Sequence, residues 1–212
     1  MKHLRMIGLA AMMVAALTAF VGISSASAAP KIHPSSTAFT GTGTLLETVG
    51  THKYVSSFTT NGGEGPFVKC EESGATGTTQ AGTTEEVTVK VTFGKCFSNI
   101  GGTLVAANVT VPLEWHLKTT VGKTLPSYTG DVKTTGTILI KVPAVGCTIS
   151  VAEQEVMAEG VNDAGTPPAG TTVNPTTATP IEVAYTQSGC AGVINGNSKY
   201  RGAVHIPTIY VE

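Results

Sequence analysis

Residues 85–119 read EEVTVKVTFGKCFSNIGGTLVAANVTVPLEWHLKT, and this stretch decides the fold class. Apolar residues alternate with mostly polar ones along 86–93 and again along 103–118. Successive side chains of a strand point to opposite faces, so the pattern predicts two strands with one buried and one solvated face each. Turn residues at 99–102 separate the two strands. Pro112 has no N–H to donate to a sheet, so the second strand should lie at an edge or bend there.

The same period of two returns later, at residues 138–142, 147–151 and 181–185. Outside the N-terminal segment, no stretch shows a sustained apolar stripe at helical spacing. The sequence therefore predicts an all-β fold, either an antiparallel β-sandwich or a barrel-like sandwich. The predicted core consists of apolar residues from these strands: Val89, Val91, Phe93, Val109, Val111, Trp115, Ile138, Ile140, Ile149 and Val183. Residues 160–180 are rich in Pro and Gly, and we expect them to be the least structured part, a long functional or mobile loop.

The first 28 residues have the three parts of a secretory signal peptide. Lys2 and Arg5 precede an apolar run at residues 6–23, and an Ala-Ser-Ala cleavage site ends at Ala28. The alternative is an uncleaved membrane anchor, because a run of about 18 apolar residues can span a bilayer. Cleavage would leave residues 29–212, which we expect to form a single secreted β domain, extracellular or in the cell envelope. Residues 122–130 form a break that is a candidate seam between two halves of this domain.

The charge of the chain bears on which partners it can bind. The chain has 13 Lys and Arg against 14 Asp and Glu, and the predicted mature part keeps 11 of the basic residues and all the acidic ones, a formal charge of −3. A weakly acidic chain without blocks of like charge gives no support to nucleic-acid binding or polybasic membrane attachment. No integral membrane segment is expected after cleavage, and the sequence does not indicate a partner.

Four cysteines follow the leader: Cys70, Cys96, Cys147 and Cys190. An even number in an exported chain predicts two disulfides. Four cysteines allow three pairings, and we favour Cys70 with Cys96 and Cys147 with Cys190. This sequential pairing keeps each bridge on one side of the break at 122–130, and each half has a cysteine beside a Gly turn, where neighbouring strands come within bridging distance. No histidine lies at zinc-ligand spacing from a cysteine, so no metal site is predicted.

A search for catalytic residues finds only weak candidates. The nucleophile motif G-x-S-x-G is absent from the sequence. A Ser-His-Asp triad would need Asp131 or Asp163, both in turn-rich surroundings. Glu153 and Glu155 form the best carboxylate pair: on one strand they would share a face about 7 Å apart, the order of separation that glycosidases use. Glutamates on one strand more often face water, so we predict no catalytic residue and no cofactor.

Short motifs carry a resemblance to a known group of proteins. Besides the leader and the four cysteines, they are GCTISV at residues 146–151 and the Tyr200-Arg201-Gly202 triplet. The chain resembles secreted four-cysteine β-rich proteins of soil actinobacteria, loosely over its whole mature part, with residues 160–180 as an insertion. That group has no established activity, so the resemblance implies a secreted domain and no particular role.

Two functional hypotheses follow from the sequence. The first is an exported, disulfide-stabilised β domain without enzymatic activity, which acts by binding or as a structural part of the envelope or extracellular space. The alternative is a secreted hydrolase of polysaccharide that uses Glu153 and Glu155. A concave pocket that holds both carboxylates would favour the hydrolase, and an open sheet would eliminate it.

Overall fold

A computed structural model describes residues 31–34, 38–78, 84, 86–111, 115–120, 126–165, 167–173 and 179–212, with the backbone alone for 115–120. The predicted signal peptide lies outside these residues. So does part of the predicted seam, residues 122–125.

The described residues form an all-β structure, which confirms the predicted class. Its strands are joined by turns and loops and by two short 3-10 turns, Asn61–Gly63 and Pro143–Val145. Every pairing between these strands is antiparallel.

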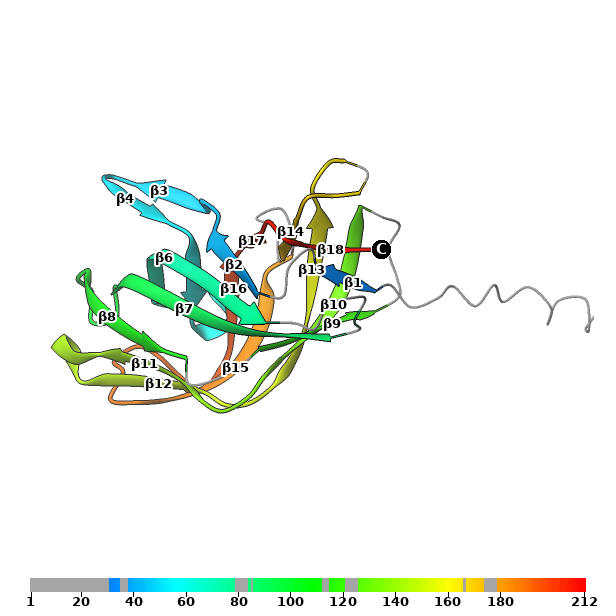
Figure 1. Cartoon of the computed structure of the whole chain (residues 1–212). Coiled ribbons are helices and arrows are strands. Elements are labelled where there is room, and N and C mark those ends of the chain that lie inside the picture. Colours follow the sequence, from blue (N-terminus) through cyan, green and yellow to red (C-terminus); the bar gives the residue numbers. More distant parts are fainter. Residues whose placement is uncertain are drawn as a thin grey trace, which may run out of the picture.

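A long hairpin of β6 (Phe67–Thr78) and β7 (Glu86–Ser98) runs along much of the molecule (Figure 1). Around it the hydrogen-bonded strands close into a barrel, and the β6–β7 pairing divides the closed order into two rings of eight described strands that share this hairpin. The first ring adds β2 (Ala38–Gly43), β9 (Trp115–Thr120), β10 (Ser127–Thr134), β13 (Glu155–Asn162), β14 (Thr171–Val173) and β17 (Val204–Ile206). The second ring adds β5 (Ser56–Thr59), β8 (Val105–Thr110), β11 (Ile138–Val142), β12 (Cys147–Val151), β15 (Ile181–Ser188) and β16 (Gly196–Gly202).

The chain crosses repeatedly from one ring to the other. The pairs β8 and β9, β10 and β11, β12 and β13, and β16 and β17 each place one strand in either ring, with only a few residues between them. Each pair therefore behaves as one long strand that is interrupted near the middle of the molecule. The interruptions are where the two rings meet.

The buried face of β6 and β7 changes between the two rings. Val87, Val89 and Val91 are buried in the first ring, whereas Cys96 and Ser98 are buried in the second, so the inward residues change from odd to even numbers. The register with β6 is the same on both sides of this change. Lys95 lies at the change with a φ of 48°, which is unusual for a residue with a side chain. The two faces of one ladder thus serve two parts of the core.

The prediction of one continuous strand at 103–118 is wrong, because the structure has two strands there, β8 and β9. Ala107 lies opposite Cys96 of β7, and Trp115 lies opposite Val89. Eight steps along one strand therefore match seven along the other, as at a β-bulge. Pro112, which cannot donate to a ladder, falls in the intervening 112–114 segment outside the described residues.

The prediction of a long loop at 160–180 is also wrong in part. β13 continues to Asn162, and Thr171–Val173 form β14, which pairs with β13 and β17. Val161 lies opposite Thr172, so this short strand completes the first ring despite the surrounding Pro and Gly residues. Tertiary pairing here overrides a local composition that is typical of loops.

The core has two clusters of buried apolar residues, one within each ring. Of the predicted core residues, Val89, Val91, Ile140 and Ile149 are buried. The others with a described side chain are half-buried: Phe93, Val109, Val111, Ile138 and Val183. The side chain of Trp115 lies outside the described part, and its backbone lies opposite Val89 and Thr134.

Four of the described strands are short and lie outside the rings. β1 (Ile32–Pro34) pairs with β18 (Ile209–Val211), which brings residues 32 and 211 together near the two ends of the described chain. β3 (Glu47–Val49) and β4 (His52–Tyr54) form a hairpin that projects from the body, at the upper left of Figure 1.

Candidate functional site: an interior cavity

An apolar cavity of about 120 Å³ lies inside the closed strands. Its wall takes residues from both rings, among them Val89 and Phe93 of β7, Ile138 of β11, Val183 of β15 and Val204 of β17. Four of these, all except Val89, are half-buried although they point inward, because part of their surface faces the cavity. Sequence alternation cannot distinguish a wall residue from a closely packed one. Seven of the predicted core residues border the cavity: Val89, Val91, Phe93, Val109, Ile138, Ile140 and Val183.

Four polar side chains border this cavity: Ser56, Thr134, Gln154 and Tyr200. The Thr134 hydroxyl donates to the Gln154 carbonyl oxygen at 3.3 Å and accepts from the Gln154 backbone N–H at 3.2 Å. The Gln154 side chain donates to the carbonyl oxygens of Ala152 and Ala184 and accepts from the Ala184 N–H. Thr134 and Gln154 are thus engaged in fastening the chain between β12 and β13 to β10 and β15.

Tyr200 of β16 is one of three aromatic residues in the wall, with Phe58 and Phe93. Its ring packs edge-on against Phe93 with 6.4 Å between ring centroids. Burial raises the pKa of the Tyr200 hydroxyl far above its usual range, and no neighbouring charge contributes. Part of its side chain is nevertheless uncovered, and because the residue lies deep in the ring, the uncovered part faces the cavity.

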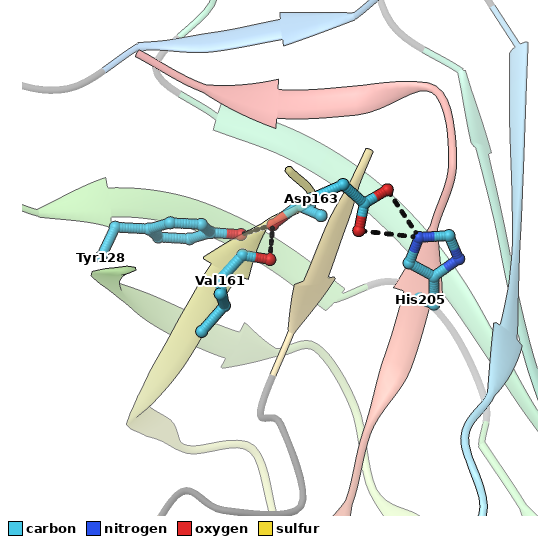
Figure 2. A network of polar contacts seen from close by, with 5 residues as sticks. Tyr128, Val161, Asp163 and His205 are labelled. Carbon is cyan, nitrogen blue, oxygen red and sulfur yellow. Dashed lines mark hydrogen bonds and ion pairs between the residues drawn. The ribbon is translucent and has the colours of Figure 1, made fainter. Parts of the chain in front are cut away.

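A second cavity of about 30 Å³ lies at the far end of the first ring, near Tyr128 and Thr171. The Tyr128 and Thr171 hydroxyls are 2.7 Å apart, and Thr171 donates to the carbonyl oxygen of Val161 at 3.1 Å (Figure 2). Burial raises the pKa of Tyr128 to about 12, and the bond to Thr171 opposes this only in part. This network joins β10, β13 and β14.

An ion pair of Asp163 and His205 lies nearby, partly exposed (Figure 2). The His205 Nε2 is 3.0 Å from Asp163 Oδ2 and 3.2 Å from Oδ1. Asp163 also donates its backbone N–H to the Gly170 carbonyl oxygen, so the pair holds the segment after β13 against β17. The neighbours of His205 across the strands are Thr42 and Thr172, and among the described contacts no serine or cysteine joins the pair as a nucleophile.

Both candidate hydrolytic carboxylates lie at the surface. Glu153 is exposed in the turn before β13 and pairs with Lys133 of β10 at 3.6 Å. Glu155 is exposed at the start of β13, and neither glutamate borders either cavity. The pair lies on an open surface, where it has no cleft in which to hold a glycosidic bond.

Two disulfides join Cys70 to Cys96 and Cys147 to Cys190, which confirms the sequential pairing. Cys70 and Cys96 are directly opposite each other in the β6–β7 ladder, and Cys70 borders the central cavity. The second bridge links the start of β12 to the residues that follow its neighbour β15. Both bridges lie in the core cluster of the second ring.

Sequence reasoning did not identify the cavity. Tyr200 entered only through the motif of the resembling group, and the Asp163–His205 pair joins residues 42 positions apart. In the part of the chain with described side chains, no group of three His, Cys, Asp or Glu residues could hold a metal ion. Of the helices within the described ranges, none has the length and apolarity to cross a membrane. No protein-family model, curated protein or solved structure matches the chain.

Proposed function

We propose that this chain is an exported binding domain that encloses a small apolar ligand in its interior. The observation that carries the proposal is the central cavity, which is bordered by residues of both rings and almost wholly apolar. Binding sites for small molecules are concave, mostly apolar and furnished with few polar groups, and the interiors of closed β-barrels are among the places where they occur. In this proposal the two rings act together as a barrel-like container.

The size of the cavity indicates the size of the ligand. An engineered apolar cavity of about 150 Å³ stays dry and binds benzene or xenon. The central cavity, at about 120 Å³, is slightly smaller. A compact molecule of about five non-hydrogen atoms therefore suits it.

Export and the absence of catalysis belong to the same proposal. Two buried disulfides are typical of proteins that mature in an oxidising compartment, and the leader-like first 28 residues agree with that. The alternative, a polysaccharide hydrolase, has lost its support because Glu153 and Glu155 lie on an open surface. A buried apolar space also cannot accommodate a polysaccharide, whose hydroxyls would lack partners there.

The test is a pair of variants that add the same bulk at two buried places. Val183 borders the cavity, whereas Val142 is completely buried and borders neither cavity. Val183→Phe should fill the cavity and abolish binding of cyclopentane, while the free energy of unfolding changes by less than about 1.5 kcal/mol. Val142→Phe should instead overpack the core, cost about 1–3 kcal/mol, and leave binding in the folded fraction unchanged.

Binding is measured by ligand-observed NMR and by the shift in thermal unfolding midpoint. At a ligand concentration ten times Kd, the native state of the unsubstituted protein should gain about 1.4 kcal/mol. Equal binding by the unsubstituted protein and Val183→Phe would contradict the proposal. So would the absence of any binding to the unsubstituted protein at saturating cyclopentane.

A further inference from the structure

The central cavity and the smaller cavity are neighbours. Four apolar residues border both of them and therefore lie between them: Val132, Ala158, Val173 and Ile206. Two partly exposed acidic residues, Asp131 and Glu159, also border the smaller cavity, so it lies close to solvent. The smaller cavity thus continues the interior space toward the far end of the first ring.

The two-stranded ribbon of β1 and β18 covers the smaller cavity. Ile32 of β1 and Ile209 and Val211 of β18 border this cavity and are almost completely buried. On the other face of the ribbon, the rings of His33 and Tyr210 stack with 5.1 Å between their centroids, and both residues are half-buried. The ribbon is therefore an apolar cover outside the rings, toward the right of Figure 1.

The ribbon is fastened at both of its edges. At the edge of β1, Ile32 exchanges two backbone hydrogen bonds with Thr84, at 2.8 and 3.0 Å. At the edge of β18, the Asn162 side chain donates to the Val211 carbonyl oxygen at 2.6 Å and accepts from the Val211 N–H at 3.0 Å. Backbone groups of an antiparallel pair point alternately inward and outward, so this buried amide takes the place that a neighbouring strand would have. Asn162 thereby connects the ribbon to β13 of the first ring.

The rest of the enclosure is held more firmly than the ribbon. Along the sides, the strands of both rings are joined by continuous backbone ladders. In the second ring, the two disulfides add covalent links between neighbouring parts of the wall. The ribbon has only non-covalent contacts among those described, so it is the part that can open locally at the lowest free energy.

Resting on the proposed function, we propose that the β1–β18 ribbon is the gate through which a small apolar ligand enters and leaves, and that Asn162 is its latch. When the ribbon moves away, the ligand passes through the smaller cavity and between the shared apolar residues into the central cavity. Asn162 borders neither cavity. It therefore positions the gate without contact with the ligand.

The experiment compares two asparagines that each fasten one part of the molecule. Asn162→Ala removes both hydrogen bonds to Val211. Asn61→Ala is the matched control, because the Asn61 side chain donates to the Gly192 carbonyl oxygen and accepts from the Ile194 N–H, between β15 and β16 of the second ring. Asn61 has a φ of 52°, so alanine also brings backbone strain there and makes the control stringent.

The measured quantities are the rates of cyclopentane entry and exit, from NMR exchange between its free and bound signals, and its Kd from titration. Each protein is purified with both disulfides intact. We expect Asn162→Ala to raise both rates by the same factor, roughly 10- to 100-fold, because two hydrogen bonds that hold the gate shut are lost. Kd should stay the same, because the cavity is unaltered and the closed form is still the major one. Asn61→Ala should change neither the rates nor Kd.

The outcomes separate the gate from the proposed function. If cyclopentane binds but Asn162→Ala leaves its rates unchanged, or Asn61→Ala raises them as much, the gate is overturned while the proposed function stands. If cyclopentane does not bind the unsubstituted protein, the proposed function fails and the gate fails with it.

Hydrogen exchange of the unsubstituted protein decides the matter if Asn162→Ala does not fold. The amides of Ile32, Val211 and Glu212 should exchange through one shared opening that costs less free energy than global unfolding. Exchange of these amides through global unfolding alone would overturn the gate.

Discussion

Removal of the Cys147–Cys190 bridge should cost about 4 kcal/mol of stability. The bridge closes a loop with a sequence separation of 43 residues, and the chain-entropy relation gives about 4.0 kcal/mol for that loop at 25 °C. The same relation gives about 3.5 kcal/mol for the Cys70–Cys96 bridge, whose separation is 26 residues. Typical domains have only about 5–15 kcal/mol in total, so either loss would be large.

The perturbation is the double substitution Cys147→Ala with Cys190→Ala, compared with Cys70→Ala and Cys96→Ala. Alanine is preferred to serine because all four cysteines are buried, and a serine hydroxyl there would need a partner. The free energy of unfolding is measured by equilibrium unfolding in urea. The difference of about 0.5 kcal/mol between the two bridges is within the extrapolation error, so the size of each loss is the informative quantity.

A loss below about 1 kcal/mol for the Cys147–Cys190 pair would refute this reasoning. It would mean that the unfolded chain is already restricted around residues 147–190, or that the bridge strains the native strands. A larger denaturant slope in the variant would indicate a more expanded unfolded state, which the entropic argument requires.

Two further predictions concern the alkaline limit of stability and the start of the mature chain. The folded-state pKa of Tyr128 is raised from 10.0 to about 12, so its contribution to stability is fully present below pH 10 and is lost as pH rises through about 12. Two pKa units correspond to about 2.7 kcal/mol. Urea unfolding at a series of alkaline pH values should show that the free energy of unfolding falls more steeply with pH in the unsubstituted protein than in Tyr128→Phe. Parallel plots of unfolding free energy against pH would contradict this. Expression in a secreting bacterial host should give protein that begins at Ala29, as checked by N-terminal sequencing, and an intact Met1 in the membrane fraction would contradict cleavage.

The fold class was predictable because period-two alternation reports directly which strand face is buried. The alternation at 86–93 continues as β7, and the segments at 138–142 and 147–151 are the strands β11 and β12. The change of buried face near Lys95 was not predictable, because the residues on either side keep a strand-like pattern whichever way they point. β14 was missed because its three residues become a strand only through pairing with β13 and β17.

The candidate site was far less predictable than the fold. Phe93, Val109, Ile138 and Val183 look like ordinary core residues in sequence, and whether an inward side chain packs or borders a void depends on every strand around it. The disulfide pairing could be predicted because it depends on which turns lie near each other along the chain. The place of Tyr200 in the cavity wall could not be predicted, because it depends on which strands close around it.

The order of strands around the two rings also limits when the interior can be sealed. From β6 onward, most neighbours in the rings are also near neighbours along the chain, so their hairpins can form as soon as each segment is available. The closing contacts are different, because β16 and β17 must reach back to β5 and β2 from more than a hundred residues away. A growing chain therefore remains an open, curved sheet with its apolar face uncovered until residues 196–206 arrive. Protection from aggregation during biogenesis depends on how promptly that last segment follows the others.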